Sequence, residues 1–384
     1  MGDRKLRAWE AAGLIDGETA ARIRAWEAEH AKPLALWAVF GIAALAIGLG
    51  VLSVVAANWD AIRGEVRLAL HMLLMAGIAG YLWLRGEGLA GRQPWVHEAI
   101  LFVLGALGLT FLGHIGQVYQ TSSPLWQPLA LWLALFAPVL LLRGSSWLTA
   151  AALVGTAVFT AWNYALEGGA NRVDYVETTA DVVRSSLVIA APVLLTGLGA
   201  WMRGKSAREA FWIRLEQLAL TYAVGLASYV VIISAFERMP GLTNAANVFL
   251  GLASGAVLGA LSAFAVGRAR RDRSGRAEAG VLLGASLAVL VAYALSGSEA
   301  VAGLLFMVLW AGIAAAALFA GWRGVFQAAV GVLAVRLIVL SFELASDLLL
   351  SGVGLIVSGL LILGVAFAAV RISRRFAPDR GQPA

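Results

Sequence analysis

The chain has 384 residues, of which 60% are hydrophobic and only 14% are charged, and its mean hydropathy is +0.82. A soluble domain carries about 25% charged residues, so this composition excludes a water-soluble fold and predicts an integral membrane protein. The chain has no cysteine, which excludes disulfides and thiolate chemistry. Its net charge is +6, but no loop interleaves basic and aromatic residues, so we expect the lipid bilayer as partner and no nucleic acid.

Residues 1–33 are polar and predict a helical hairpin on the cytoplasmic face. Gly13 fits the turn after a first short helix, and Asp16 fits the N-cap of a second helix that runs from Gly17 to about His30. The apolar residues of this hairpin are Leu6, Trp9, Ile23 and Trp26. They form either a docking or regulatory surface for a protein partner or a second copy, or an apolar stripe that packs internally and on the bundle.

Twelve apolar runs follow, each close to the roughly 20 residues that cross a bilayer as a helix. They are 34–57, 66–84, 97–117, 126–142, 146–166, 185–202, 212–236, 242–267, 277–297, 299–321, 324–350 and 351–370. The first begins late and is too long for a cleavable signal peptide. We therefore expect an all-α polytopic bundle of about 12 transmembrane helices over 34–370, a basic cytoplasmic tail over 371–384, and no soluble catalytic domain.

The basic residues indicate how this bundle is oriented. With twelve spans, 23 of the 29 Lys and Arg residues lie on the side that holds both termini, and five lie on the other side. Cytoplasmic loops of membrane proteins collect Lys and Arg. The sequence therefore predicts a multi-pass protein of the bacterial inner membrane with both termini in the cytoplasm.

Polar residues gather at the outer ends of the first and third spans. Asn58, Trp59 and Asp60 end the first span, and Gln117, Tyr119 and Gln120 end the third. They form either structural helix ends, since Asn and Asp satisfy terminal amides and Trp favours the interface, or an extracytoplasmic mouth. His114 shares a helix face with Gln117 and is a candidate for a proton or ligand role, against a hydrogen-bonded packing role; His71 in the second span is a weaker candidate.

Two further segments carry polar or small residues without a catalytic pattern. The acidic outer loop 167–184 is either a weak cation site or a solvated loop, and its spacing matches no metal loop, so we expect no metal and no cofactor. In the eighth span Gly251, Gly255 and Gly259 recur every four residues. Such a face predicts close helix packing, either static or as a sliding surface.

The eleventh span holds the most unusual residues. Arg336, Glu343 and Asp347 are separated by seven and four residues, which places them within about 20° of one helix direction. An unpaired basic residue in mid-membrane costs about 2.5–3.5 kcal/mol, so a partner on another helix is expected for Arg336; Glu216, His71 and His114 are the candidates. The set is either a proton pathway, in which Arg336 tunes a carboxylate, or a static ion-pair clasp.

Two of these motifs carry a family resemblance. Ala57-Asn58-Trp59, after the glycine-rich stretch Gly41 to Gly50, and Gly116-Gln117-Val118-Tyr119 resemble the bacterial membrane protein family called domain of unknown function 2157. The hairpin start around Gly13 is also similar, so the resemblance covers about residues 1–120. The chain from Arg336 to Gly359 is similar to the last spans of related families. The resemblance implies a polytopic inner-membrane protein and supplies no catalytic residue or substrate.

Three classes of function are compatible with this pattern. A proton-coupled transporter or permease-like carrier is favoured by the many spans, the Arg/Glu/Asp face and the small-residue helix. The alternative is a sensor or assembly component that acts through its cytoplasmic hairpin, and a lipid-modifying intramembrane enzyme is the third class. Nucleophile, phosphate-loop and metal motifs are absent from the sequence, so we expect a protein that is not an enzyme.

Overall fold

The computed structural model describes residues 6, 9–29, 46, 62–165, 179–235, 245–295, 297–344 and short stretches between 356 and 371. All regular structure in these residues is helical, which confirms the all-α class. The chain divides into two compact units, Met1–Arg67 and Leu68–Ala384. Each unit is described on its own below.

The first unit contains the expected turn and second helix of the hairpin. Helix α2 spans Gly17–Glu29, and the Asp16 carboxylate accepts a hydrogen bond from the Thr19 backbone N–H at 2.8 Å. Gly13 has φ of 69°, a left-handed conformation that glycine adopts without strain. The predicted turn and N-cap are therefore confirmed. Hydrogen bonds from Thr19 also hold the pKa of Asp16 below its ordinary value, as expected for a carboxylate that caps a helix.

The remaining helices follow in chain order, with short connections in the described part. They are α4 (Gly64–Arg92), α5 (Pro94–Val118), α6 (Trp126–Arg143), α7 (Trp147–Ala165), α8 (Thr179–Ala190), the 3₁₀ helix η3 (Ala191–Val193), α9 (Leu194–Arg203), α10 (Glu209–Ile233), α11 (Ala245–Ala269), α12 (Arg273–Ala294), α13 (Glu299–Ala320) and α14 (Arg323–Leu344). Each apolar run predicted between residues 66 and 350 coincides with one of these helices. The run 185–202 is the exception, because it is covered by α8, η3 and α9 together.

The expected number of twelve membrane spans is wrong for the described residues. Seven helical segments there are long and apolar enough to cross a membrane. Helix α7 is not among them, because three threonines and Asn163 lower its hydropathy; α11 and α14 are not among them because their fully described stretches are shorter than a membrane span. The predicted first span, 34–57, and most of the last, 351–370, lie outside the described residues. The chain is a multi-pass membrane protein, and the count of twelve is not supported.

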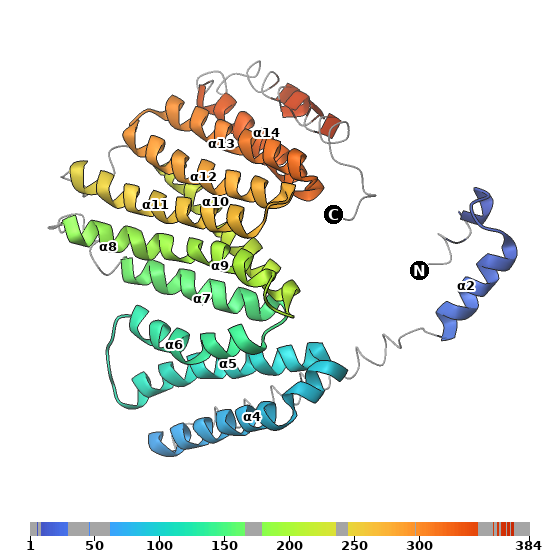
Figure 1. The fold of residues 1–384 in the computed structure, drawn as a ribbon, viewed down its shortest axis with the longest axis vertical. Helices are drawn as coiled ribbons and strands as arrows, with labels where there is room; N and C mark the ends of the chain where they lie inside the picture. Colours follow the sequence, from blue (N-terminus) through green and yellow to red (C-terminus); the bar gives the residue numbers. More distant parts are fainter. Residues whose placement is uncertain are drawn as a thin grey trace. The chain divides into compact units, whose positions relative to one another are not determined.

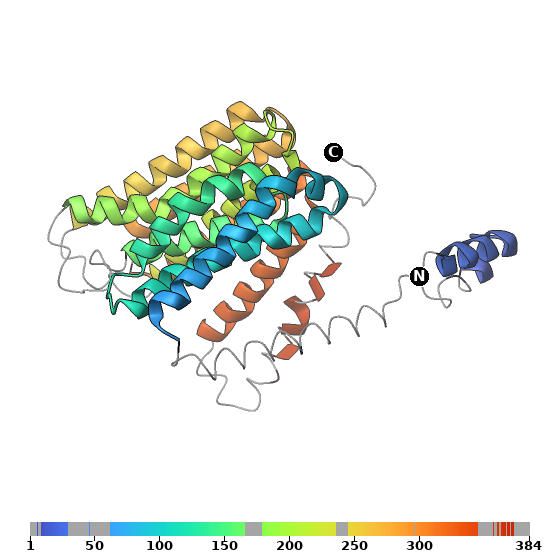
Figure 2. The same cartoon turned by 90° about the horizontal axis from the view of Figure 1, so that it is seen from below.

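Within the second unit the helices pack side by side, with α10 at the centre. Helix α10 contacts α7, α9, α12 and α13, while α11 contacts α8, α9 and α12 (Figures 1 and 2). The largest cluster of buried apolar side chains joins α10, α12, α13 and α14, and a second joins α6, α7 and α10. Because α10 belongs to both clusters, it is buried on two sides, and a polar residue on either side is surrounded by protein.

The predicted sixth span is interrupted by the 3₁₀ turn Ala191–Val193, which contains Pro192. Proline removes a backbone donor and breaks the α-helical hydrogen-bond ladder. Two side chains from neighbouring helices bind carbonyls beside the break: Tyr222 donates to Ile189 O at 2.8 Å, and Ser262 donates to Val193 O at 3.2 Å. The interruption is thus fixed by α10 and α11, and it faces the cavity described below.

Candidate functional site

The residues singled out on the eleventh span are only partly described. Arg336 lies on α14 with a half-buried side chain, while the side chain of Glu343 and all of Asp347 lie outside the described residues. Glu216, one of the candidate partners for Arg336, forms its ion pairs with Arg203 and Arg270 instead. The expected role of Glu216 is therefore corrected, and the proton-pathway hypothesis for Arg336 stays a prediction.

The residues of the candidate extracytoplasmic mouth are also only partly described, whereas both histidines, His71 and His114, are described. Asn58, Trp59 and Asp60 lie outside the described residues. Tyr119 follows the last residue of α5 and is exposed, as is Gln117. His114 is buried, its ring centroid lies 5.9 Å from that of His71, and His71 Nε2 lies 3.1 Å from Leu107 O. The structure thus brings His71 and His114 together between α4 and α5.

The glycines of α11 lie where neighbouring helices come close. A Cβ atom at Gly251 would collide with Val182 and Ser186 of α8, and one at Gly259 would collide with Ser286 of α12. At Gly255 the nearest atom would be Ala190 Cβ, at an ordinary 3.7 Å. The three glycines therefore differ: Gly251 and Gly259 permit close packing, whereas Gly255 has room for a methyl group.

The most unusual group of charges lies where α9 and α11 end and α10 and α12 begin. Nη1 of Arg270 lies 3.0 Å from Oε1 of Glu216 and 3.0 Å from Oε2 of Glu278. The residues Glu216 and Glu278 are only 2% and 3% exposed. We call Glu216 and Glu278 the acid pair. One guanidinium nitrogen thus bridges two buried carboxylates that come from different helices.

The acid pair is not fully satisfied by its neighbours. Oε2 of Glu216, 3.5 Å from Nη1 of Arg203, and Oε1 of Glu278 accept no hydrogen bond from the described residues. Arg203 and Arg270 are also bound by Glu209 and Asp272, at 3.2 and 3.1 Å. This ion-pair network therefore holds four carboxylates and two guanidinium groups, and a buried carboxylate without full compensation is costly.

The local structure explains how the network is held. Gly199 of α9 lies directly against the backbone of Glu216, where an added Cβ would sit 2.9 Å from Glu216 Cβ and 3.1 Å from its Cα. Asp272 caps α12 by accepting from Gly275 N at 3.0 Å. Burial alone would lower the pKa of Arg270, but Glu216, Glu278 and Asp272 overcome it and raise that pKa. Arg270 is therefore a permanent cation between the acids.

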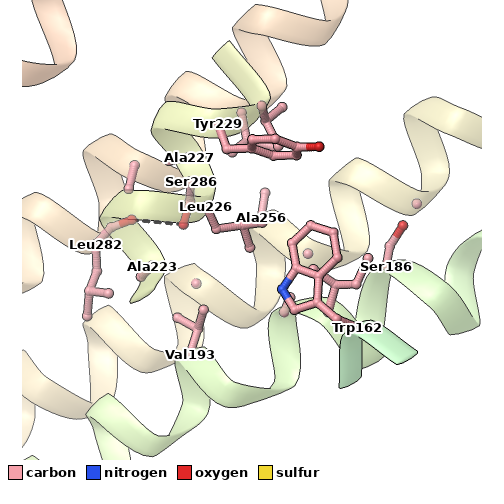
Figure 3. A pocket seen from close by; sticks show the side chains of 18 residues that line it. Trp162, Ser186, Val193, Ala223, Leu226, Ala227, Tyr229, Ala256, Leu282 and Ser286 are labelled. Carbon is pink, nitrogen blue, oxygen red and sulfur yellow. Dashed lines mark hydrogen bonds between the residues drawn. The ribbon is translucent and has the colours of Figure 1, made fainter. Parts of the chain in front are cut away.

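An apolar cavity of about 230 Å³ lies farther along the same helices (Figure 3). Its wall contains Leu282, one turn beyond Glu278 on α12, and Ala223, two turns beyond Glu216 on α10. Small and aliphatic residues from α8, η3, α10, α11 and α12 form most of the remaining wall. The rings of Trp162 and Tyr229 meet there edge to face at 6.0 Å, and Ser186 and Ser286 add hydroxyl groups.

A second buried carboxylate, Glu98 of α5, has a different environment. It accepts hydrogen bonds from the backbone N–H groups of Ser145 and Ser146, at 2.5 and 3.1 Å, and from the hydroxyls of Ser145 and Thr149, at 2.7 and 2.8 Å. We call Glu98 with these donors the Glu98 clasp. It places a negative charge before the N-terminus of α7, which is stabilising, and satisfies all four donors.

Two arginines bind backbone carbonyls of the connection between α6 and α7, which also contains the serines of the Glu98 clasp. Arg208 donates to Leu141 O and to Gly144 O, the latter at 2.6 Å, and Arg214 donates to Ser145 O. These contacts tie the α9–α10 connection to the end of α6, where cations are favourable. Burial lowers the pKa of Arg208, and the nearby Glu98 carboxylate opposes that shift. The Glu98 clasp and the acid pair therefore lie at the same end of the helices.

Sequence reasoning missed most of these charges for one reason. Glu98 and Glu278 are each the second residue of a predicted span, a position where acids commonly end a loop, and Arg203 and Arg270 lie in basic loops that indicate only the orientation of the bundle. The usable signal was an acid within two turns of a helix start that lies beside arginine-rich connections. No group of three or more His, Asp or Glu side chains suited to a metal ion occurs in the described part.

These features define a polytopic α-helical membrane protein with a buried acid pair beside an apolar cavity. Residues 7–149 match the family model described as "Predicted membrane protein (DUF2157)". The match confirms the family resemblance and extends it beyond residue 120, through the serines and threonine of the Glu98 clasp. Comparison with curated proteins gave no match, and comparison with solved structures gave none. The acid pair and the whole wall of the apolar cavity lie outside the matched residues.

Proposed function

We propose that this chain is a proton-coupled carrier of a small apolar or amphipathic solute in the bacterial inner membrane. The acid pair carries the proposal, because two buried carboxylates share Nη1 of Arg270 and each retains an oxygen without a hydrogen bond. A proton on either carboxylate would remove one of the two buried negative charges that share Arg270. Ionisable groups inside a membrane protein commonly mark ion or proton pathways.

The apolar cavity supports the solute half of the proposal. Its wall is largely apolar, with two serine hydroxyls, the Tyr229 hydroxyl and the Trp162 indole N–H as polar groups, which suits a small solute with a hydrophobic body. The cavity adjoins the 3₁₀ interruption at Ala191–Val193. Broken membrane helices often line transporter sites, because they place free backbone groups and a hinge beside the solute.

The proposed cycle uses only residues of this chain. A proton enters from the loop side of the bundle, where Arg203 and Arg270 face the surface, and binds between Glu216 and Glu278. Neutralising the pair weakens its hold on Arg270 and releases the packing between α10 and α12. The proposal places this loop side in the cytoplasm, as the basic loops favour, and assigns the chain no enzymatic activity.

A solute-driven proton flux assay tests the proposal. Full-length chain in liposomes, with a pH-sensitive dye inside, is exposed to a panel of small apolar and amphipathic solutes under an imposed pH gradient. At least one solute should drive dye-reported proton movement, and Glu278→Gln should reduce that flux at least tenfold. Glu299→Gln removes an exposed carboxylate at the start of α13 and should leave the flux unchanged.

The assay also identifies failure of the proposal. Wild-type flux in the folded Glu278→Gln chain would exclude the acid pair as the coupling site, and no flux with any solute would contradict a carrier.

The second candidate, a sensor or assembly role, is favoured by the exposed Trp26 and Leu14 of the hairpin, at 61% and 70%. That role predicts no flux and loss of partner binding in Trp26→Ala.

A further inference from the structure

A second cavity, of about 500 Å³, lies at the loop end of the bundle and is lined by charged side chains. Four basic residues, Arg203, Lys205, Arg270 and Arg271, and two acidic ones, Glu209 and Asp272, form most of its wall. It sits between the α9–α10 and α11–α12 connections. We call it the basic pocket.

Only some of the charged side chains of the basic pocket form ion pairs within the described part of the chain. The two acids are bound by Arg203 and Arg270. Lys205 Nζ lies 3.8 Å from the ring centroid of Trp201, and neither Lys205 nor Arg271 forms an ion pair with any residue that the structure describes. The pocket lining therefore carries a net positive charge with two available cations, which suits a singly charged phosphate.

The pocket also lies at the level where a lipid headgroup would be. It is formed where helices long enough to cross a membrane end, and Trp201, a residue type enriched at the membrane interface, is half exposed beside it. On α11 the side chains Leu261 and Phe264 are 54% and 68% exposed and precede Arg268 on one helix face, and Arg271 follows the end of the helix. This apolar face offers a path for acyl chains below the pocket.

We propose that the basic pocket binds the phosphate headgroup of an anionic phospholipid, with its acyl chains along the exposed face of α11. Lys205 and Arg271 contact the phosphate, and Glu209 at the rim accepts from headgroup hydroxyls. Basic pockets between membrane helices are a recognised form of lipid site. The proposal does not depend on the carrier function, because lipid binding can be measured without any transport.

The test measures lipid binding to the full-length chain in neutral detergent by native mass spectrometry. The probes are phosphatidylglycerol, phosphatidylethanolamine, phosphatidylcholine and soluble glycerol phosphate. Phosphatidylglycerol should bind most tightly, and Lys205→Gln with Arg271→Gln should weaken it about 30-fold, since each charge near an anionic surface contributes about fivefold. Arg85→Gln with Arg92→Gln removes two exposed charges of α4 and should leave binding unchanged.

Each other outcome overturns part of the proposal. Equal binding of phosphatidylcholine or phosphatidylethanolamine would exclude selection for negative charge. Displacement of the lipid by equimolar glycerol phosphate would show that the pocket takes free phosphate rather than a lipid. Unchanged binding in the Lys205 and Arg271 double variant would place the lipid elsewhere. Both replaced side chains are exposed, so matching size-exclusion profiles should show that the variant folds.

Discussion

The Glu98 clasp and the acid pair place buried carboxylates at the same end of one set of helices. They differ in how many hydrogen bonds their carboxylate oxygens accept. Glu98 receives four hydrogen bonds, two on each oxygen. Glu216 and Glu278 share one nitrogen of Arg270, and each keeps an oxygen without a hydrogen bond. The difference indicates that Glu98 holds a fixed charge for structure, whereas the acid pair can change its charge at lower cost.

The largest expected effect is on the Glu98 clasp. Glu98→Gln replaces an acceptor oxygen by an amide that cannot accept from Ser146 and Thr149, so buried donors lose their partner. We expect a loss of about 3–5 kcal/mol in the free energy of unfolding, measured by reversible denaturation in mixed micelles. Glu87→Gln is the control, because the Glu87–Arg143 pair is exposed and such pairs contribute little. Equal effects of the two changes would contradict the clasp.

The next effect concerns the bridging arginine. Arg270→Gln leaves Glu216 and Glu278 facing each other without a shared cation, and should cost about 2–3 kcal/mol in the same measurement. Adding Glu278→Gln should recover much of that loss, because one of the two charges is then gone. A double variant that is less stable by the sum of both single effects would show that Arg270 and Glu278 are not coupled.

Close packing of α9 on α10 should matter less than either charge. Gly199→Ala forces a methyl group against the Glu216 backbone and should cost about 1–2 kcal/mol. Gly255→Ala adds the same methyl group where the nearest atom is 3.7 Å away, and should change stability by under about 0.5 kcal/mol. If both substitutions are neutral, the helices do not hold Glu216 as closely as described.

The smallest effect depends on pH. Burial tends to raise the pKa of Asp272, but hydrogen bonds from Gly275 and Arg270 outweigh it and hold the pKa below its ordinary value of 3.8. The ionised cap therefore stabilises the folded state above about pH 4, and this contribution is lost as pH falls through the lowered pKa. Asp272→Asn should cost about 0.5 kcal/mol at pH 7, with the difference shrinking below pH 4. A constant difference across that range would contradict it.

The sequence was sufficient for the class of fold but not for the site. Apolar runs between residues 66 and 350 predicted the helices, because burying about 20 apolar residues in a bilayer demands a helix. Among the described residues the count of membrane spans was too high, in part because run length alone did not weigh the threonines and Asn163 of α7. The acid pair was missed because Glu216 and Glu278 lie 62 positions apart, and only the packing of α10 on α12 brings them to Arg270.

The Glu98 clasp and the acid pair also differ in their relation to the matched family. Glu98 and its four donors lie within residues 7–149, whereas Glu216, Arg270 and Glu278 lie beyond them. The clasp is thus built from the segment that the family model describes. The proposed coupling site belongs to the later helices, so activity attributed to this chain should be sought in α9–α12.

The most direct test of the central claim is an infrared titration of the full-length chain in lipid, which follows the carbonyl stretch of protonated carboxylic acids. We predict a band that appears as pH falls and disappears as it rises, that is absent in Glu278→Gln, and that is retained in a folded Glu98 variant. A band that persists unchanged in Glu278→Gln, or one that disappears only with Glu98, would contradict the assignment of the exchangeable proton to the acid pair.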